Sequence, residues 1–445
     1  MKLFGTDGLR GRAGEFPLDS ASVTTVGREV GRRLSAGPGP RTVVLGGDTR
    51  ASTLDLLSRL AGGVSAQGCA IACAGVLTTP GVAEVVLGLR AGAGISVSAS
   101  HNPFEDNGIK IFGSDGRKWP DAWEEALEVA LLSERETHAA TGGEDAGMPP
   151  ASDPGLAEMY LARLAEHVPV RLHNISIVID AGHGAAYKLG PEALRRAGAQ
   201  VLPMHDSPDG RNINDGCGAL HPESMARTTR ERGAHLGVAL DGDADRAIFA
   251  DETGRILDGD DVLWIIATDW KRKGILAPGG VVGTVMSNFG LEAALEREGI
   301  ALHRAAVGDR NVALKMRETG APIGGETSGH VLLPFSPAGD GIQTALVVAS
   351  IAAESGAPLS RLATLTKVPQ LLRNVRVTRK VPLEDMPAVG AALERARREL
   401  DHTGRVLLRY SGTESLLRIM VEGLNAAQVS QIADALETAV RAELA

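Results

Sequence analysis

The sequence predicts an α/β protein of four domains, in which three similar α/β units with mixed, mainly parallel sheets precede a C-terminal α+β domain. Strand-like β-branched runs alternate with helical patterns along most of the 445 residues, which is typical of layered α/β folds. Three of the apolar strands end in polar loops, at residues 98–103, 241–246 and 325–330. The residues after 366 have a different pattern and are expected to form a separate small domain.

Length and composition limit the class of protein. A chain of 445 residues is too long for one ordinary core and suggests roughly two to four domains. A net charge of −9 argues against nucleic-acid and membrane partners, and 3% aromatic residues argue against stacking on bases. No apolar run approaches the roughly 18 residues of a membrane span, and residues 1–8 lack the apolar segment of a signal peptide. We therefore expect a cytoplasmic protein.

The three cysteines indicate a reducing compartment. Cys69, Cys73 and Cys217 form an odd, sparse set with no Cys-x-x-Cys pair. This pattern disfavours both a zinc-binding framework and a disulfide framework. We expect reduced structural thiols, as is usual in cytosolic proteins.

The first domain is expected to span residues 1–150. Its predicted strands are 41–45, 69–73 and 94–98, each a short and mainly apolar run. Residues 133–155 are rich in Glu, Thr, Gly, Asp and Pro and show no periodicity. They are therefore expected to form a linker to the second domain.

The second and third domains are expected to span residues 151–250 and 251–366. Both repeat the alternation of short apolar strands with helical segments. Their strands are expected at residues 175–180, 200–203 and 236–240, and at residues 281–285, 301–304 and 322–324.

The C-terminal domain is expected to span residues 367–445. Its two predicted strands, 374–378 and 405–409, are each expected to precede a helix. The final helix has apolar residues at the spacing of a single helical face. These residues are Val429, Ile432, Ala433, Leu436 and Val440.

The acidic loop after the strand 236–240 is the strongest local sign of chemistry. Asp241, Asp243 and Asp245 alternate along it, and alternate residues of an extended segment point the same way. Three close carboxylates repel one another unless a hard divalent cation removes that cost. Three protein ligands suit Mg²⁺ whose shell is completed by phosphate or water. A solvated acidic turn is the alternative interpretation.

The loop after the strand 94–98 contains Ser100, His101 and the pair 102–103, Asn-Pro. Adjacent residues on an extended loop face apart, so His101 is expected to be a poor base for Ser100. A serine that carries phosphate beside a metal ion needs no such base between turnovers. A purely structural loop is the alternative. Lys110 is a candidate acid or base if it lies nearby, although taken alone it is better explained as a surface lysine.

Two further loops have residue types that bind sugars and phosphates. Glu326 and Ser328, in a glycine-rich turn, can hold vicinal hydroxyls of a sugar. Arg409 begins a turn that suits a phosphate, because a guanidinium gives bidentate charge-assisted bonds, and Arg10 lies on another glycine-rich turn. Ordinary polar turns are the alternative for each. The phosphate turn reads Arg409-Tyr410-Ser411-Gly412-Thr413-Glu414, with Arg418 beyond it.

The order of these four loops resembles that of the α-D-phosphohexomutase superfamily, and the resemblance covers the whole chain. In that family Ala-Ser-His-Asn-Pro carries a phosphoserine and Asp-Gly-Asp-x-Asp-Arg binds Mg²⁺. Gly-Glu-x-Ser-Gly-His contacts the sugar, and Arg-x-Ser-Gly-Thr binds the substrate phosphate. The resemblance implies four domains around a central cleft, one Mg²⁺ per subunit and a phosphorylated Ser100.

The resemblance also implies roles for individual residues. The candidate metal ligands are Ser100, Asp241, Asp243 and Asp245. The candidate substrate-binding residues are Glu326, Ser328, His330, Arg409, Ser411, Gly412, Thr413 and Arg418. The candidate catalytic residues are Ser100, Lys110, His330, Arg10 and Arg246, with Lys110 favoured over His330 as the acid or base.

Within the superfamily, residues 4–11, 209–214 and 409–423 are most similar to the bacterial phosphoglucosamine mutases. This similarity implies interconversion of glucosamine 6-phosphate and glucosamine 1-phosphate, with a bisphosphorylated sugar as intermediate and activator. Thr327 and Ser415 depart from the usual pattern, which has Gln and Pro there. The alternatives are a phosphomannomutase/phosphoglucomutase and a Mg²⁺-dependent sugar phosphatase. Sugar phosphates are the expected partners, with a homodimer as a candidate assembly.

Overall fold

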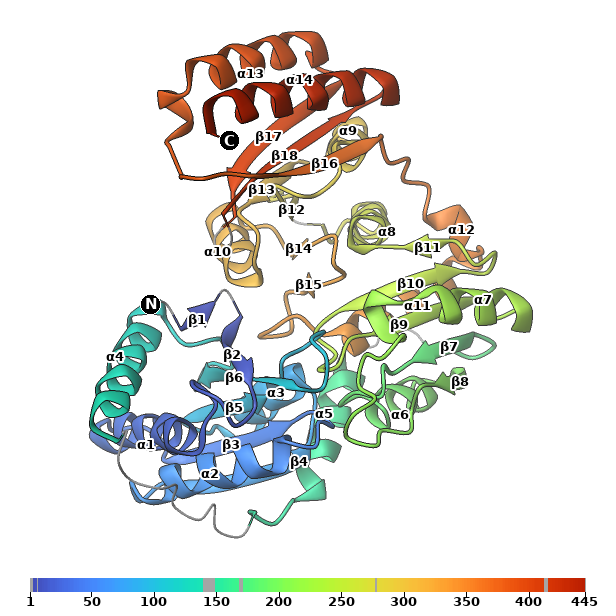
Figure 1. Cartoon of the computed structure of the whole chain (residues 1–445). Helices are drawn as coiled ribbons and strands as arrows, with labels where there is room; N and C mark the ends of the chain where they lie inside the picture. Colours follow the sequence, from blue (N-terminus) through green and yellow to red (C-terminus); the bar gives the residue numbers. More distant parts are fainter. Residues whose placement is uncertain are drawn as a thin grey trace. The chain divides into compact units, whose positions relative to one another are not determined.

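The computed structural model describes residues 3–5, 7–138, 149–167, 171–276, 278–411 and 415–444 (Figure 1). Within these ranges the chain forms two compact units. The first unit holds two mixed sheets and most of a third, and the second holds an antiparallel sheet together with residues 285–304 of the third domain. The first unit comprises Met1–Thr284 and Ala305–Thr364, and the second comprises Val285–Arg304 and Leu365–Ala445.

The first sheet has the strand order β1-β2-β6-β5-β3-β4. β3 pairs in parallel with both β4 and β5, and β6 returns antiparallel to β5. The predicted strands 41–45, 69–73 and 94–98 all appear, each shifted by one to three residues at an end. The strands are β1 (Phe4–Gly5), β2 (Gly8–Arg12), β3 (Thr42–Gly47), β4 (Ala70–Val76), β5 (Ala93–Val97) and β6 (Asp106–Gly113).

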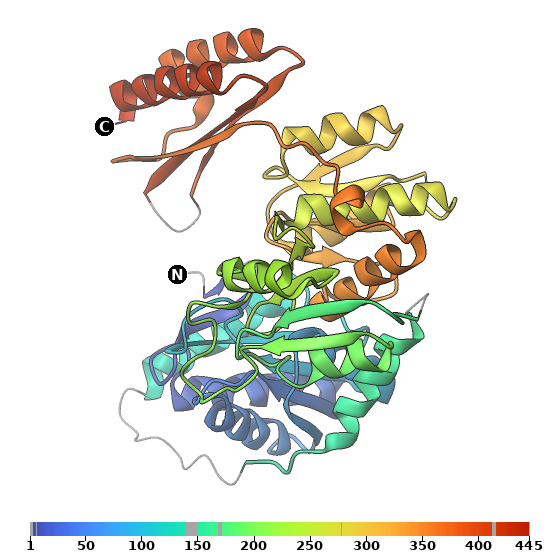
Figure 2. The same cartoon turned by 90° about the vertical axis from the view of Figure 1, so that its right-hand side faces the viewer.

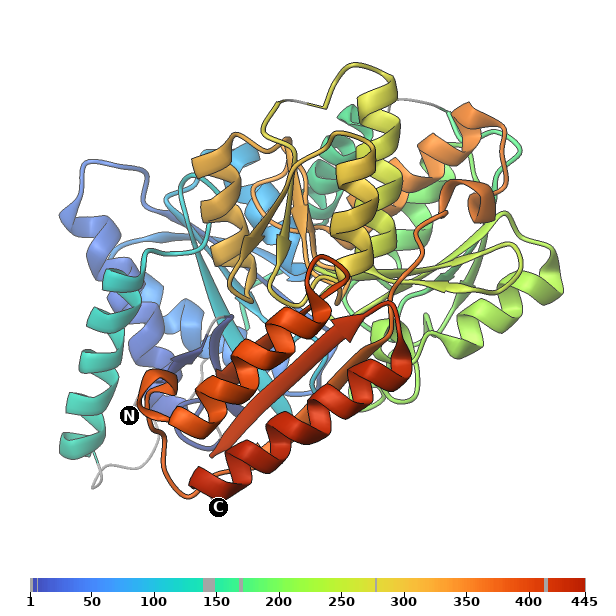
Figure 3. The same ribbon diagram turned by 90° about the horizontal axis from the view of Figure 1, so that it is seen from above.

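The core of this first domain lies between the sheet and three helices, α1 (Ser20–Ala36), α2 (Thr53–Ser65) and α4 (Asp121–His138). α3 (Thr79–Leu89) starts sharply, because the Thr78 hydroxyl accepts a hydrogen bond from the Gly81 N–H and a proline occupies the first turn. Figure 3 shows α4 beside α1. The sheet therefore has a buried, rigid centre from which the loop after β5 emerges.

The prediction of a linker over residues 133–155 is wrong at both ends. α4 continues to His138, and α5 (Pro154–Glu166) begins before the predicted linker ends. Leu131 is buried in the core, and Glu134 pairs with Arg28, so the charged residues of this stretch form the outer face of a packed helix. Residues 139–148 of the predicted linker lie outside the described part of the chain.

The second sheet has the order β11-β10-β9-β7-β8, with β7 parallel to β8 and β9. β9 and β10 are antiparallel, with Leu240 opposite Ala247, so the acidic loop 241–246 is the turn that joins them. The strands are β7 (Ser176–Asp180), β8 (Gln200–Met204), β9 (Leu236–Leu240), β10 (Ala247–Asp251) and β11 (Ile256–Leu257); the helices are α6 (Leu189–Arg196) and α7 (Glu223–Arg232).

In the third domain, β12 runs parallel to β14, and β14 is antiparallel to β15. Gly325 lies opposite Val331, so the predicted sugar loop is the turn between β14 and β15. The strands are β12 (Val281–Thr284), β13 (Leu302–Ala305), β14 (Ile323–Gly325) and β15 (Val331–Leu332); the helices are α8 (Gly259–Arg272), α9 (Phe289–Arg297), α10 (Asp309–Thr319), α11 (Gly341–Ser355) and α12 (Leu359–Leu362).

The second unit contains a three-stranded antiparallel sheet in the order β16-β18-β17. Helices α13 and α14 cover one of its faces, as Figure 2 shows for this unit. The expectation of a helix directly after the strand 405–409 is wrong: the next described element is β18, which pairs antiparallel with β17, and helix α14 follows it. The elements are β16 (Gln370–Arg376), α13 (Pro387–Leu400), β17 (Gly404–Tyr410), β18 (Leu416–Gly423) and α14 (Ala426–Leu444).

The predicted apolar face of the final helix is confirmed. All five of its predicted core residues are buried in the core of the second unit. None of the described helices combines the length and the apolar composition that a membrane crossing requires.

Leu436→Ala should lower the free energy of unfolding by about 2–5 kcal/mol, because Leu436 is completely buried and its loss leaves a cavity. Urea unfolding, followed by circular dichroism, measures the change. Gln431→Ala, on the exposed face of the same helix, is the matched control and should stay within about 0.5 kcal/mol of the parent. Equal stability of the two variants would contradict the packing of α14.

Candidate active site

Ser100 is held in a constrained turn three residues after β5 ends. It is completely buried, and its backbone φ of 54° lies in the left-handed region that non-glycine residues avoid. The Ser100 N–H donates to the Ser98 hydroxyl at 2.9 Å, and that hydroxyl donates to Asp48 Oδ2 at 2.5 Å. This chain of bonds fixes the unusual backbone conformation and aims the Ser100 side chain.

The carbonyl groups around Ser100 are held by two side chains from distant parts of the chain. Arg50 donates to the Ser100 carbonyl at 3.2 Å and to the Asn102 carbonyl at 2.6 Å. The Asn214 amide donates to the same two oxygens at 3.0 and 3.1 Å. Arg50 also pairs with Asp48, and both side chains are fully buried. The serine loop is therefore clamped from two sides.

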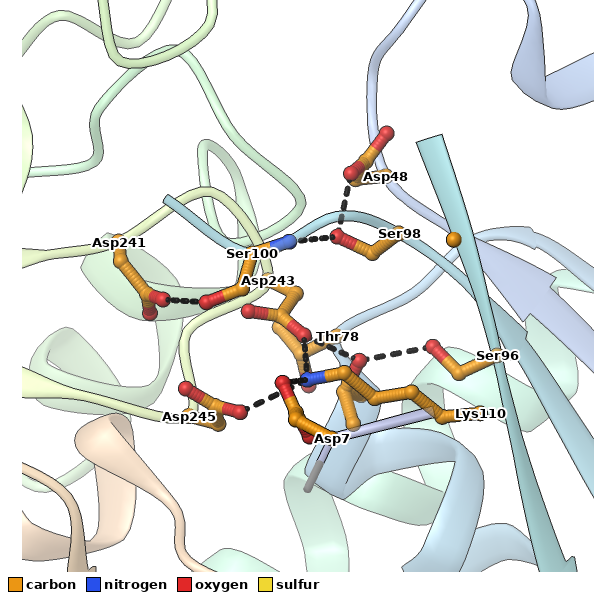
Figure 4. Close-up of polar contacts among 12 residues, drawn as sticks. Asp7, Asp48, Thr78, Ser96, Ser98, Ser100, Lys110, Asp241, Asp243 and Asp245 are labelled. Carbon is orange, nitrogen blue, oxygen red and sulfur yellow. Dashed lines mark hydrogen bonds and ion pairs between the residues drawn. The ribbon is translucent and has the colours of Figure 1, made fainter. Parts of the chain in front are cut away.

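The Ser100 hydroxyl donates to Asp241 Oδ2 at 2.5 Å (Figure 4). His101 Nδ1 also lies 3.4 Å from Ser100 Oγ, so the expectation that these two side chains face apart is wrong. The left-handed backbone at Ser100 breaks the alternation of an extended chain and turns both side chains to one side. Burial lowers the pKa of His101 to about 4, with help from Arg246 and Arg10, so its ring is neutral at physiological pH.

The three aspartates among the predicted metal ligands lie together and are buried. One carboxylate oxygen each from Asp241, Asp243 and Asp245 lies within 4.8 Å of the others. Burial, with the charges of Asp245 and Asp243, holds the pKa of Asp241 well above its usual range. Asp243 Oδ1 and Asp245 Oδ1 are buried without a hydrogen-bond partner among the described residues. Such oxygens, converging from a single loop, fit a hard divalent cation such as Mg²⁺.

Lys110, on β6, is the cation that the described structure places among these carboxylates (Figure 4). Its Nζ lies 2.8 Å from Asp243 Oδ2, 2.9 Å from Asp245 Oδ2 and 3.0 Å from Asp7 Oδ2. Burial alone disfavours the ammonium form, but the three carboxylates outweigh it and raise the pKa of Lys110 well above its usual value. Lys110 is thus a buried ammonium group, and not a surface lysine.

The sugar loop meets the acidic loop through His330. His330 Nδ1 lies 3.7 Å from Asp245 Oδ1, and its Nε2 lies 3.8 Å from Asp309 Oδ2. Burial opposes a charge on the ring, but Asp245 and Asp309 raise the pKa of His330 to about 9. Glu326 Oε1 accepts a hydrogen bond from the Gly308 N–H at 2.9 Å, and Ser328 is exposed. Of the three sugar-loop candidates, only His330 contacts the acidic loop.

The two remaining catalytic candidates also lie at this site. Arg10 Nη1 donates to Asn102 Oδ1 at 3.2 Å, and the Arg10 guanidinium pairs with Asp7. Arg246 lies 3.8 Å from Asp245 Oδ1 and donates its backbone N–H to Asp241 at 3.1 Å. Both guanidinium groups therefore border the loops of Ser100 and the aspartates.

The predicted phosphate residues belong to the second unit. Arg409 and Arg418 lie directly opposite each other on β17 and β18. Both are half-buried, and burial together with Arg418 lowers the pKa of Arg409. Two like charges in register cost stability unless an anion joins them. Ser411 is buried beside them, whereas Gly412 and Thr413 lie outside the described residues.

Sequence analysis missed several residues that build the site. Asp7, Asp48, Arg50 and Asn214 all contact Ser100, Lys110 or the residues that hold them. Asp48 and Arg50 come directly after β3, so they follow the same pattern of a polar loop after an apolar strand. That signal was available at β3. Asp7 and Asn214 lie in the segments 4–11 and 209–214 that carry the family resemblance, but no local pattern indicates their roles, because only the folded chain brings them to the site.

Comparison with known protein families gives four matches along the chain. They are described as the phosphoglucomutase/phosphomannomutase alpha/beta/alpha domains I, II and III and the C-terminal domain, over residues 1–138, 158–254, 258–368 and 372–439. The chain therefore belongs to the phosphoglucomutase/phosphomannomutase family, within the α-D-phosphohexomutase superfamily. The predicted four-domain α/β fold and the family are both confirmed.

Within this family, the chain is similar over its whole length to bacterial phosphoglucosamine mutases. The chain is 45% identical to the phosphoglucosamine mutase of Koribacter versatilis, and the match covers 99% of this chain and 96% of that protein. It is 44% identical to the phosphoglucosamine mutase of Symbiobacterium thermophilum, with coverage of 100% and 99%. A crystal structure of a phosphoglucomutase/phosphomannomutase family protein from Burkholderia thailandensis has the same fold, with a TM-score of 0.80, 24% identity and coverage of 99% and 97%.

Lys110→Met should destabilise the metal-free protein by about 3–5 kcal/mol, because it leaves buried carboxylates without their cation. Mg²⁺ should then raise the melting temperature of this variant more than that of the parent, since the ion replaces the missing charge. Thermal unfolding with EDTA and with Mg²⁺ measures both effects. Lys315→Met, which removes an exposed lysine pair, is the control. A variant as stable as the parent in EDTA would show that Lys110 does not neutralise the aspartates.

Proposed function

We propose that the protein interconverts glucosamine 6-phosphate and glucosamine 1-phosphate, with Ser100 as the phosphoryl carrier. The observation that carries this proposal is the buried Ser100 hydroxyl, 2.5 Å from a carboxylate of the three-aspartate loop. The choice of amino sugar is supported by full-length identity of 45% and 44% to bacterial phosphoglucosamine mutases.

The proposed reaction has two balanced half-reactions. In the first, the free sugar hydroxyl oxygen bonds to the phosphorus of phospho-Ser100 while the Ser100 Oγ–P bond breaks. The hydroxyl proton leaves the sugar, and Ser100 Oγ gains a proton, which yields a bisphosphorylated sugar. After this intermediate turns around, Ser100 Oγ takes the other phosphoryl group, and the sugar oxygen that loses it is protonated. No net proton or water is consumed.

The residues around Ser100 are proposed to transfer protons and to stabilise negative charge in these steps. Lys110, kept as an ammonium by its carboxylate neighbours, is the proposed acid that protonates a leaving oxygen. Neutral His101, 3.4 Å from Ser100 Oγ, is able to accept a hydrogen bond from the serine. Arg10, Arg246 and cationic His330 surround the site with positive charge. These groups stabilise the charge of a transferring phosphoryl group.

The proposed metal is one Mg²⁺ per subunit, held by Asp241, Asp243 and Asp245 together with the phosphorylated Ser100. When bound, Mg²⁺ neutralises negative charge on the transferring phosphoryl group. One buried carboxylate oxygen each of Asp243 and Asp245 lacks a hydrogen-bond partner among the described residues, which supports this ligand set. Asp241 fixes the hydroxyl of unphosphorylated Ser100, the form that exists while the bisphosphorylated sugar turns around.

Substrate recognition is assigned to the two remaining loops. Glu326 and Ser328, with His330, are proposed to bind the sugar hydroxyls. The phosphate that is not being transferred is assigned to Arg409 and Arg418, which lie opposite each other on β17 and β18, because guanidinium groups give bidentate charge-assisted bonds to phosphate. This set comprises Arg409, Ser411, Gly412, Thr413 and Arg418.

Three further statements belong to the proposal. The domain bounds are taken as 1–150, 151–250, 251–366 and 367–445. The bisphosphorylated sugar is taken as the activator as well as the intermediate. A cytoplasmic location and a homodimeric assembly complete the description.

Ser100→Ala should abolish mutase turnover while the protein still folds, because the carrier oxygen is lost and the small side chain fits the site. A coupled assay of glucosamine 1-phosphate formation measures turnover, and intact-mass spectrometry detects one phosphate on the parent but not on the variant. Ser65→Ala, at an exposed serine, is the control. Turnover in Ser100→Ala close to that of the parent would reject the phosphoserine role.

The sugar preference is tested with kcat/KM on the 1-phosphates of glucosamine, glucose and mannose. The proposal expects the glucosamine compound to give the highest value. A clear preference for mannose or glucose would instead make the protein a phosphomannomutase or phosphoglucomutase. Release of inorganic phosphate that matches substrate loss, without isomer formation, would identify a sugar phosphatase.

A further inference from the structure

A second group of metal-ligating side chains lies at the carboxyl ends of β7 and β8, in the first unit. Asp180 is the last residue of β7, and His205 directly follows β8. Cys217 ends the long loop after β8 and precedes a short 3-10 turn. One ligand atom of each residue lies within 4.8 Å of the other two. The three residues belong to no part of the phosphoryl-transfer site described above.

The group is compact and largely shielded from water. Asp180 and Cys217 are buried, and His205 Nδ1 lies 3.0 Å from Asp180 Oδ2. Both Asp180 oxygens are also anchored by backbone N–H groups, of Gly182 at 2.8 Å and of Gly218 at 3.0 Å. The carboxylate therefore has a fixed orientation before any ligand binds.

The chemistry of the three donors indicates what they bind. A thiol sulfur, an imidazole nitrogen and a carboxylate oxygen form the mixed set that Zn²⁺ and related transition metals prefer. Mg²⁺ prefers oxygen ligands only, as in the loop of Asp241, Asp243 and Asp245. The other two cysteines, Cys69 and Cys73, lie on or beside β4 in the first sheet, so Cys217 has no described cysteine with which to form a disulfide.

A role for Cys217 as a free nucleophile is disfavoured. Burial, with Asp180 and Asp215 nearby, raises the pKa of the Cys217 thiol to about 12, so the unliganded residue is a thiol at neutral pH. The thiolate is the reactive form in nucleophilic and redox chemistry. A divalent cation, by contrast, displaces the thiol proton as the metal–sulfur bond forms.

We propose that Asp180, His205 and Cys217 form a second metal site, which binds a thiophilic divalent cation such as Zn²⁺. Binding forms one metal–sulfur, one metal–nitrogen and one metal–oxygen bond, and releases the thiol proton to solvent. Three protein ligands leave a fourth tetrahedral position for water. The ring of His183 lies near that of His205, with the two ring centroids 5.3 Å apart.

Two features connect this site to the serine loop: a residue of the chain segment between His205 and Cys217, and the close packing of Gly218 against Leu240. Asn214, between His205 and Cys217 in the chain, donates to the carbonyls of Ser100 and Asn102. A Cβ on Gly218 would lie 2.6 Å from the carbonyl oxygen of Leu240, the residue before Asp241. A cation that joins the two ends of the loop 205–217 therefore braces the segment that holds Ser100.

The test is a Co²⁺ titration of the full-length, metal-stripped protein in excess Mg²⁺, which keeps the three-aspartate loop occupied. One equivalent of Co²⁺ should produce thiolate-to-cobalt charge-transfer absorption and the visible bands of tetrahedral cobalt, and Zn²⁺ should remove both. Cys217→Ser should abolish the charge-transfer band, and His205→Asn should weaken Co²⁺ binding at least tenfold.

Matched controls assign the signal to this site. Cys69→Ser, at another buried cysteine, should keep the full charge-transfer band, as should Asp243→Asn in the catalytic loop. Absence of the band from the parent protein, or its survival in Cys217→Ser, would overturn the proposal. Survival of the visible cobalt bands in Cys217→Ser, together with their loss in Asp243→Asn, would also overturn it, because the cobalt would then occupy the catalytic loop. If Cys217→Ser does not fold, His205→Asn decides the question, because the His205 ring is only half-buried. No readout uses turnover, so the result is independent of the proposed function.

Discussion

The mutual repulsion of buried carboxylates is the constraint on which the active site depends. Asp7, Asp243 and Asp245 gather around the ammonium group of Lys110, and Asp241 lies beside Asp243 and Asp245 in the same loop. Two like charges 4 Å apart cost about 4 kcal/mol at an effective dielectric constant near 20. Arg10 and Lys118 also pair with Asp7, and Arg246 and His330 lie near Asp245. An excess of negative charge nevertheless remains in the loop, and burial together with the charges of Asp245 and Asp243 raises the pKa of Asp241. The same excess makes the loop a strong site for a divalent cation.

The strained turn at Ser100 is the second determinant of the site. A left-handed conformation at a non-glycine residue costs of order 1–3 kcal/mol and persists only where surrounding bonds impose it. Ser98, Arg50 and Asn214 supply those bonds from three different segments. Because of this turn, Ser100 Oγ faces both Asp241 and His101. The strain thus has a clear use, since it directs the serine oxygen at the acidic loop.

The two sites offer different donor atoms and therefore prefer different metal ions. The catalytic loop offers only carboxylate oxygens, which suit Mg²⁺ and a phosphate ligand. The group around Cys217 adds sulfur and nitrogen, which select a softer cation. Their coupling runs through Asn214, which lies in the loop of one site and holds the serine of the other. A cation at Cys217 would therefore act on the rigidity of the serine loop and not on the chemistry itself.

The sequence by itself determined the strand-and-loop order, the acidic triad after β9 and the core face of α14, because each depends on a local pattern of apolar and polar residues. Local composition misjudged the end of α4 and gave no strand where β18 lies, because helix packing and strand pairing depend on partners distant in the chain. Only the tertiary structure buried Lys110 among the aspartates and turned His101 toward Ser100. It also brought Asp180, His205 and Cys217 together, although their spacing matches no metal-binding motif. Long-range packing decides which side chains meet, and no local spacing encodes it.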